Sequence, residues 1–256
     1  MAEERSGVQS ISRLFSIVET LAANPSGIPL QKLANETGLA KSTAHRLVCS
    51  LIELGYAMQD SITGHYRLTL KMFELSSGVV NEMNVVNMAK PHLDKLAREI
   101  GETVHLVIRD GADIVYLYKA EAGTQRMASR VGMRNHLYCT GVGKAILATL
   151  PHDEVEHIWE QSTHPALTEH TITQLPALAE QLRVVRACGY AIDDEENELG
   201  VRCVALALPG PGGKADAAFS ISSLTPQMNH ERIAQLAERA LVTRRAILQD
   251  MGLKIR

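Results

Sequence analysis

Residues 41–54 combine small polar and basic side chains at the spacing of one helix face. Four apolar residues share one side of a helical wheel: Ala44, Leu47, Val48 and Leu51. The opposite side and its flanks carry the polar set Lys41, Ser42, Thr43, His45 and Arg46, with Cys49 beside them. Such a face suits a helix that enters the major groove of DNA, where arginine pairs with guanine and small polar side chains contact phosphates or bases. The alternative is an ordinary solvated helix face.

A glycine-rich segment, Gly141–Lys144, could cradle an anion. A nucleotide-binding P-loop would need glycine where Tyr138 stands and serine or threonine where Ala145 stands, so nucleotide hydrolysis is excluded. A milder interpretation remains, in which the backbone N–H groups of Gly141 and Val142 open a helix and bind a carboxylate. The alternative is a plain glycine-rich helix start.

Acidic and thiol side chains give weaker signals. The acidic run Asp193–Glu198 is typical of a solvated loop, and no histidine or cysteine spacing supports a metal site there. Cys139 with His136, or Cys203 with any histidine, could imitate a thiol nucleophile and its base, but nothing in the sequence orients such a pair. We therefore expect no catalytic residue, no cofactor and no metal.

The sequence around residues 41–54 predicts the helices and strands that hold this segment in place. Apolar periodicity predicts helices over residues 11–21, 30–37 and 41–54, and then strands around Tyr56–Met58 and Tyr66–Leu68. Asp60–Gly64 has the composition of a hairpin turn. This order is that of a winged helix-turn-helix, which makes DNA binding the favoured interpretation of residues 41–54. His65 and Arg67 would lie on the wing, within reach of the adjacent DNA backbone.

The rest of the chain predicts a second, larger α/β part. Helices are expected over residues 70–83, 85–100, 143–150, 153–161, 174–188 and 229–251. Strands are expected over residues 103–109, 114–120, 190–193, 203–208 and 217–222, and residues 126–131 could form another. Ser220 and Ser222 then share one strand face, where they could line a pocket or simply bond backbone groups. The whole chain is α+β: a winged helix-turn-helix at 1–69, a linker helix at 70–84 and a second domain at 85–256.

Composition limits the class of protein. The 256 residues are 45% hydrophobic and 21% charged, with a net charge of −3. Residues 1–80 carry seven basic and seven acidic residues, so any DNA affinity must come from local placement of charge. The start of the chain has no apolar signal region, and no run reaches about 18 apolar residues, so we expect a cytoplasmic protein without a membrane partner. Four cysteines without CxxC spacing predict reduced thiols.

Four blocks of sequence, in this order, resemble the IclR family of bacterial transcription regulators. They are Ala40–Leu47 with Leu51 and Gly55-Tyr56, Gly101–Leu106, Thr140–Ala145, and Asp193–Glu196 continuing through Gly200–Cys203. The resemblance covers residues 10–253. It implies a winged helix-turn-helix, a linker helix and a GAF-like effector-binding domain. It also implies a homodimer, or a dimer of dimers (a homotetramer), on palindromic double-stranded operator DNA.

The resemblance further implies a small organic acid as effector. Carried over by motif, its pocket would use Gly141, Val142, Asp193, Cys203, Ser220 and Ser222, with Met127 and Leu137 as apolar walls. Asn135 stands where family members that bind very small acids carry leucine, so it suits a hydroxylated ligand. Residues 167–176 and 195–200 look most like the sugar and sugar-acid regulators of the family, which favours a sugar acid or a keto acid.

The residues do not decide between repressor and activator, and we take a repressor as the expectation. Three alternatives stay open: a winged helix that binds a protein partner instead of DNA, a thiol-dependent enzyme of the second domain, and a metal sensor built on Asp193–Glu198.

Overall fold

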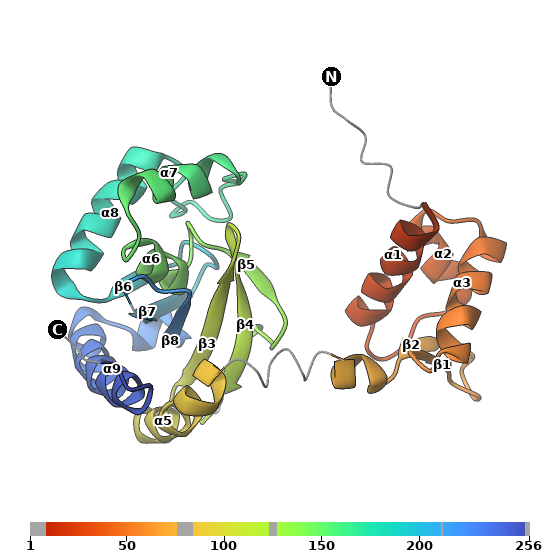
Figure 1. Cartoon of the computed structure of the whole chain (residues 1–256), viewed down its shortest axis with the longest axis horizontal. Helices are drawn as coiled ribbons and strands as arrows, with labels where there is room; N and C mark the ends of the chain where they lie inside the picture. Colours follow the sequence, from red (N-terminus) through yellow and green to blue (C-terminus); the bar gives the residue numbers. More distant parts are fainter. Residues whose placement is uncertain (1–8, 76–83, 123–126, 211, 254–256) are drawn as a thin grey trace. The chain divides into compact units, whose positions relative to one another are not determined.

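Helices and strands fall into two groups along the chain (Figure 1). The computed structural model describes residues 9–75, 84–122, 127–210 and 212–253. The chain divides into two units, Met1–Glu82 and Met83–Arg256. In the described parts, none of the helices has the length and apolar composition needed to cross a membrane.

The N-terminal unit is a winged helix-turn-helix, as the sequence predicts. Its elements are α1 (Gln9–Ala23), α2 (Leu30–Thr37), α3 (Lys41–Glu53), β1 (Ala57–Gln59) and β2 (Tyr66–Leu68). Gly38 takes φ +65° after α2, a conformation that favours glycine, and so turns the chain into α3. The apolar sides of the helices and wing meet in one core, which includes Ile17, Leu21, Leu33, Val48 and Tyr66.

Two details of this unit differ from what the spacing of apolar residues in the sequence predicts. The first strand begins at Ala57, which is buried, whereas Met58 is exposed. Tyr56 precedes the strand because its N–H donates to the Leu51 carbonyl at the end of α3. On α1, Ile11 and Phe15 follow the helical spacing but remain 54% and 57% exposed, outside the core of their own unit. Helical periodicity identifies the element but not which apolar residues it buries.

The C-terminal unit is built on one antiparallel sheet in the order β5-β4-β3-β8-β7-β6. Its strands are β3 (Thr103–Asp110), β4 (Asp113–Ala120), β5 (Arg134–His136), β6 (Ala191–Asp194), β7 (Val201–Leu208) and β8 (Ala217–Leu224). Its helices are α5 (Asn84–Ile100), α6 (Gly141–Leu147), α7 (His152–Glu160), α8 (Leu175–Cys188) and α9 (His230–Asp250), with a short η1 (Thr225–Gln227).

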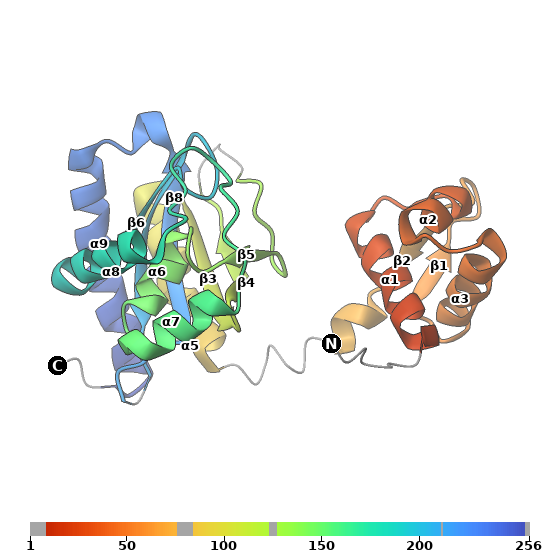
Figure 2. The same cartoon turned by 90° about the horizontal axis from the view of Figure 1, so that it is seen from above.

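Helices cover both faces of this sheet (Figures 1 and 2). α5 and α9 pack against each other and against one face, while α6 packs on the other face with α8 beyond it. Because side chains alternate along a strand, Cys203, Ala205 and Ala207 of β7 point to the α6 face. Because helices cover both faces of the sheet, most residues of β7 and β8 are buried, and the buried polar residues Ser220 and Ser222 lie on the α6 face.

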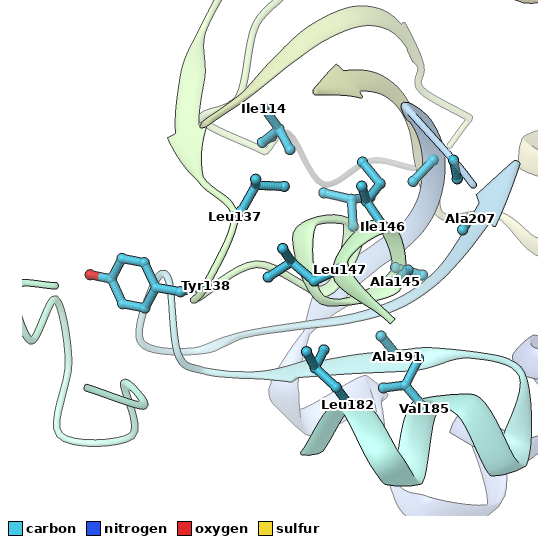
Figure 3. Close-up of a cluster of buried hydrophobic side chains, with 14 of the residues drawn as sticks. Ile114, Leu137, Tyr138, Ala145, Ile146, Leu147, Leu182, Val185, Ala191 and Ala207 are labelled. Carbon is cyan, nitrogen blue, oxygen red and sulfur yellow. The ribbon is translucent and has the colours of Figure 1, made fainter. Parts of the chain in front are cut away.

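α6 approaches the chain before it unusually closely at Gly143. A Cβ built on Gly143 would lie 2.1 Å from the carbonyl oxygen of Leu137. The same contact brings Leu137 into the core beside Ile114 and Ile146 (Figure 3). Gly143 is therefore required for packing, not for phosphate binding. At Gly141 the fit is looser, because a Cβ there would lie 3.2 Å from Cβ of Ala205.

Two predicted elements were not found as expected. Residues 127–131 form no strand, and the edge strand β5 begins only at Arg134, whereas Arg126 lies outside the described residues. Lys119 explains the first difference, because its ammonium group donates to the carbonyls of Met127 and Ser129 at 2.8 Å each and so occupies groups that a strand would pair. Of the predicted linker helix, residues 71–75 are helical and 76–83 lie outside the described residues.

We expect Gly143→Ala to destabilise the C-terminal unit far more than Gly141→Ala. The first methyl group would collide with backbone, which cannot move without shifting α6, at a cost of about 1–3 kcal/mol or more. The second needs shifts of only a few tenths of an ångström. Thermal unfolding of both variants tests this, and equal melting temperatures would contradict it.

Candidate functional site

A cavity opens on the α6 face of the sheet in the C-terminal unit. Its volume is about 60 Å³, which is room for a small molecule. Eight of the nine residues predicted for an effector site line it: Met127, Asn135, Gly141, Val142, Asp193, Cys203, Ser220 and Ser222. Residues far apart in the sequence thus meet around one space.

Leu137 does not line this cavity, so its prediction as an apolar wall is wrong. Its side chain is 1% exposed and belongs to the core beneath α6, as Figure 3 shows. The reason is the backbone contact with Gly143, which fixes Leu137 under the helix. Apolar walls are supplied instead by Met127, Met133 and Val201.

His105 is the main lining residue that the sequence reasoning missed. Its Nδ1 lies 3.2 Å from Ser222 Oγ and its Nε2 lies 2.7 Å from Ser129 Oγ. Burial, and then the positive charge of Lys119, lowers the pKa of His105 to about 4. The ring is therefore neutral near pH 7, with one nitrogen donating and the other accepting. A signal was present in the sequence, because His105 stands among the apolar residues Val104 and Leu106 within the predicted strand 103–109.

A polar network extends from His105 across the floor of the cavity. Ser220 Oγ lies 3.4 Å from Ser222 Oγ, and Asn135 Nδ2 donates to the Tyr116 hydroxyl at 3.4 Å. Tyr116 reaches the α6 face because Leu106 pairs with Tyr118 while Val107 pairs with Tyr116, which leaves Leu117 as a bulged residue. The floor can thus donate and accept several hydrogen bonds to a hydroxylated molecule.

A buried charged cluster lies beside the cavity. Lys144, 1% exposed, forms an ion pair with Glu196, whose Oε2 has no hydrogen-bond partner in the described part of the chain. Asp193, 5% exposed, accepts from the N–H groups of Glu196 and Asn197 at 2.9 and 3.4 Å, both through Oδ1. Burial raises the pKa of Asp193 to about 7, although Lys144 acts in the opposite direction.

The predicted DNA-reading residues lie on the outer face of α3 and on the wing. Lys41, Ser42, His45, Arg46 and Arg67 are exposed, while Thr43 and His65 are half-buried. Ala44, Val48 and Leu51 hold the opposite face of α3 in the core. Asp60 forms the wing turn by accepting from the N–H groups of Ile62 and Thr63, and the Thr63 bond chiefly lowers the pKa of Asp60. The helix thus presents a small, polar and basic surface.

Comparison with known proteins identifies both units. Residues 10–61 match the family model described as the IclR helix-turn-helix domain, and residues 77–248 match that of the bacterial transcriptional regulator IclR C-terminal domain. The chain belongs to the IclR family. The predicted membership and fold class are therefore confirmed, and the family is one of bacterial transcriptional regulators.

Relatives extend over nearly the whole length of this IclR-family chain. The DNA-binding transcriptional repressor YiaJ of Escherichia coli is 35% identical and covers 100% of this chain and 93% of its own. The regulator KdgR of the same organism is 35% identical, and the match covers 96% of this chain and 93% of KdgR. The crystal structure of IclR from Thermotoga maritima matches with a TM-score of 0.82 at 30% identity, over 96% of this chain and 100% of that one.

Some observations bear on the alternatives of a thiol-dependent enzyme and a metal sensor in this IclR-family domain. The His136 ring hydrogen-bonds to Asp113 through Nδ1 at 2.8 Å, and the Cys139 thiol donates to the backbone carbonyl of His136 at 4.0 Å. Burial raises the pKa of Cys139 to about 12 and that of Cys203 above its usual range, which opposes thiolate formation. In the described residues no group of three histidine, cysteine or acidic side chains could hold a metal.

We expect Lys144→Met to lower the free energy of unfolding by about 3–5 kcal/mol, because it leaves the Glu196 carboxylate buried without its cation. The double variant Lys144→Met/Glu196→Leu should recover most of that loss. Lys214→Met, at the exposed pair with Glu154, serves as control and should cost less than about 1 kcal/mol. Urea unfolding measures all three, and equal losses for both lysines would contradict a buried pair.

We expect the His105 ring to stay neutral down to about pH 4, because burial disfavours its charged form. Since the folded-state pKa is depressed below 6.5, the stability that the neutral ring contributes is present above pH 6.5 and is lost as the pH falls toward 4. NMR titration of the histidine ring protons, assigned with His105→Gln, measures the midpoint. A midpoint above pH 6 would show that the ring is not held neutral.

Proposed function

We propose that this IclR-family protein is a repressor that binds operator DNA through α3 and the wing. A small organic acid, of the sugar-acid or keto-acid class, controls it by binding in the cavity of the C-terminal unit. The observation that carries the proposal is that one chain contains both features: a polar cavity of small-molecule size in the family's C-terminal domain, and an exposed basic helix in its helix-turn-helix domain.

The effector class is supported by the chemistry of the cavity. Asn135, Tyr116 and the serines supply donors and acceptors on one side, and the backbone of Gly141 and Val142 lies at the other. Thr140 already accepts from the Gly143 N–H at 3.1 Å, so the amides of Gly141 and Val142 are the ones positioned for a ligand carboxylate. A hydroxylated acid would use both sides, whereas an apolar ligand would leave buried polar groups unpaired.

The DNA-binding arrangement follows from the size of one helix-turn-helix. A single α3 reads one half-site, so we propose a homodimer, or a dimer of dimers, that places two recognition helices about 34 Å apart on a palindrome. Residues 1–69 would bind DNA, 85–256 would bind the effector, and 70–84 would connect them as a linker helix. Operator binding also assigns the protein to the cytoplasm.

Control by the effector is a matter of differential affinity. The ligand must bind the protein's DNA-free arrangement more tightly than its DNA-bound one, and each tenfold change in operator affinity requires about 1.4 kcal/mol of difference. A small acid that makes several hydrogen bonds in a buried cavity can supply that amount.

Fluorescence anisotropy on the DNA upstream of the protein's own gene, with Arg46→Ala beside the unchanged protein, tests the proposal. We expect salt-sensitive binding at least about 10³-fold tighter than to random DNA, which Arg46→Ala weakens by about 1–3 kcal/mol. Arg183→Ala is the matched control, because Arg183 forms an exposed ion pair with Glu180 on α8, in the other unit. Sugar acids and keto acids should then weaken the complex.

A different result would select another function. Equal affinity of Arg46→Ala and the unchanged protein for every promoter tried would contradict DNA reading by α3. The same exposed helix would then be a protein-binding surface. If the protein binds its operator but no acid alters that binding, the proposed DNA-binding function stands and the proposed effector class is overturned.

A further inference from the structure

The cavity has an unexpected charge balance for a site that takes an acid. Among the described residues that line it, none is lysine or arginine. The lining residues with carboxyl groups are Asp193 and Glu198, and the ring of His105 is neutral near pH 7 and lies between Ser129 and Ser222. An anion entering this space would meet negative charge and no positive side chain.

Two lysines beside the lining of the cavity, Lys144 and Lys119, are already engaged. Lys144 lies behind the lining, 1% exposed, and its ammonium group is paired with Glu196. Lys119 donates to the carbonyls of Met127 and Ser129 and forms an ion pair with Glu121. With Asp193 ionised, the group Lys144, Glu196 and Asp193 carries a net charge of −1 before any ligand arrives. A bound carboxylate would make that −2 in a site of low dielectric constant.

Asp193 lies where an incoming carboxylate would meet it. A Cβ built on Gly141 would lie 3.3 Å from the Asp193 amide nitrogen and 3.4 Å from its Cβ, so a ligand at the Gly141 amide is next to this side chain. The Asp193 carboxyl accepts two hydrogen bonds from backbone N–H groups, and both are accepted by Oδ1. Oδ2 accepts none within the described part of the chain, and it is the oxygen left for the ligand.

Every element packed around Asp193 contributes a group that bears on its charge. α6 contributes Lys144, and the loop after β6 contributes Glu196 and Glu198. β7 contributes Cys203, the register partner of Asp193, and β4 contributes Tyr116, both of which have raised pKa values and stay neutral. Cys139 is likewise neutral and His105 is neutral on β3. Arg202 does not balance the negative charge of Asp193, because it forms an ion pair with Asp194.

We propose that the cavity takes up an organic acid together with one proton, which Asp193 holds while the acid is bound. This inference rests on the proposed function. The proton comes from solvent and adds to the Asp193 carboxylate, and no other bond forms or breaks. The carboxyl then becomes an O–H donor to an oxygen of the ligand carboxylate, a short charge-assisted hydrogen bond, and two carboxylates no longer face each other.

The direction of the pH effect follows. Burial already holds the pKa of Asp193 at about 7 in the free protein, and a bound anion raises it further. Below pH 7 the proton is in place before the acid arrives, so affinity changes little with pH. Above pH 7 each binding event must capture a proton, so affinity falls by up to about tenfold per pH unit.

Isothermal titration calorimetry on the full-length protein tests this with D-gluconate and pyruvate as probes, and with their amides as neutral counterparts. Paired buffers of different ionisation enthalpy at pH 6 and pH 8 count the protons. We expect almost no proton uptake at pH 6, nearly one proton per acid at pH 8, and an affinity about tenfold weaker at pH 8. An amide that binds should take up no proton.

Asp193→Asn keeps the shape of the side chain and removes the titration. It should abolish the proton uptake and make the affinity for the acid the same at both pH values. Asp194→Asn, one residue along on the exposed side and paired with Arg202, is the matched control and should keep both effects. The proton count on the unchanged protein stands by itself if the Asp193 variant does not fold.

Three results would overturn the inference. An acid that binds at pH 8 without proton uptake would show that Asp193 stays ionised in the complex. Binding of the amides but not of the acids would show that the cavity rejects carboxylates altogether. If neither acid binds or alters operator affinity at either pH, the proposed effector class fails and this inference fails with it, whereas the first result leaves that class intact.

Discussion

The close contact between α6 and the Leu137 backbone is the constraint on which the C-terminal unit depends. Only glycine fits at position 143, because a Cβ there would lie 2.1 Å from the Leu137 carbonyl oxygen. That contact seats the short helix on the sheet, places Gly141 and Val142 at the cavity and buries the Lys144 side chain. Packing and site geometry are therefore set by the same interaction.

Burial of Lys144 has an electrostatic consequence for the neighbouring cavity. A buried ammonium group must have a partner, and Glu196 supplies it. The pair is neutral as a unit, so it cannot serve as the counter-charge for an anion in the cavity. Asp193 is left without a cation of its own, and burial then favours its protonated form. The acid–base character of the site is thus a by-product of how α6 packs.

Local patterns in the sequence predicted most of the secondary structure and the family. Helical periodicity identified α3 and the face it buries, because Ala44, Val48 and Leu51 repeat at the helical period. The strands expected over residues 103–109 and 114–120 correspond to β3 and β4, and four short blocks in order identified the IclR family, as the matching family models confirm. Local patterns suffice for these features because each depends on neighbours in the chain.

Which residues meet at the cavity could be seen only from the folded arrangement of the chain. Leu137 looked like a pocket wall but lies in the core, and His105 looked like an ordinary strand residue but lies on the floor. The bulge at Leu117 puts Tyr116 and Lys119 on one face although they are three residues apart, which strict alternation would forbid. The physical reason is that strand register, helix seating and burial are set by contacts between segments distant in the sequence, which no local pattern contains.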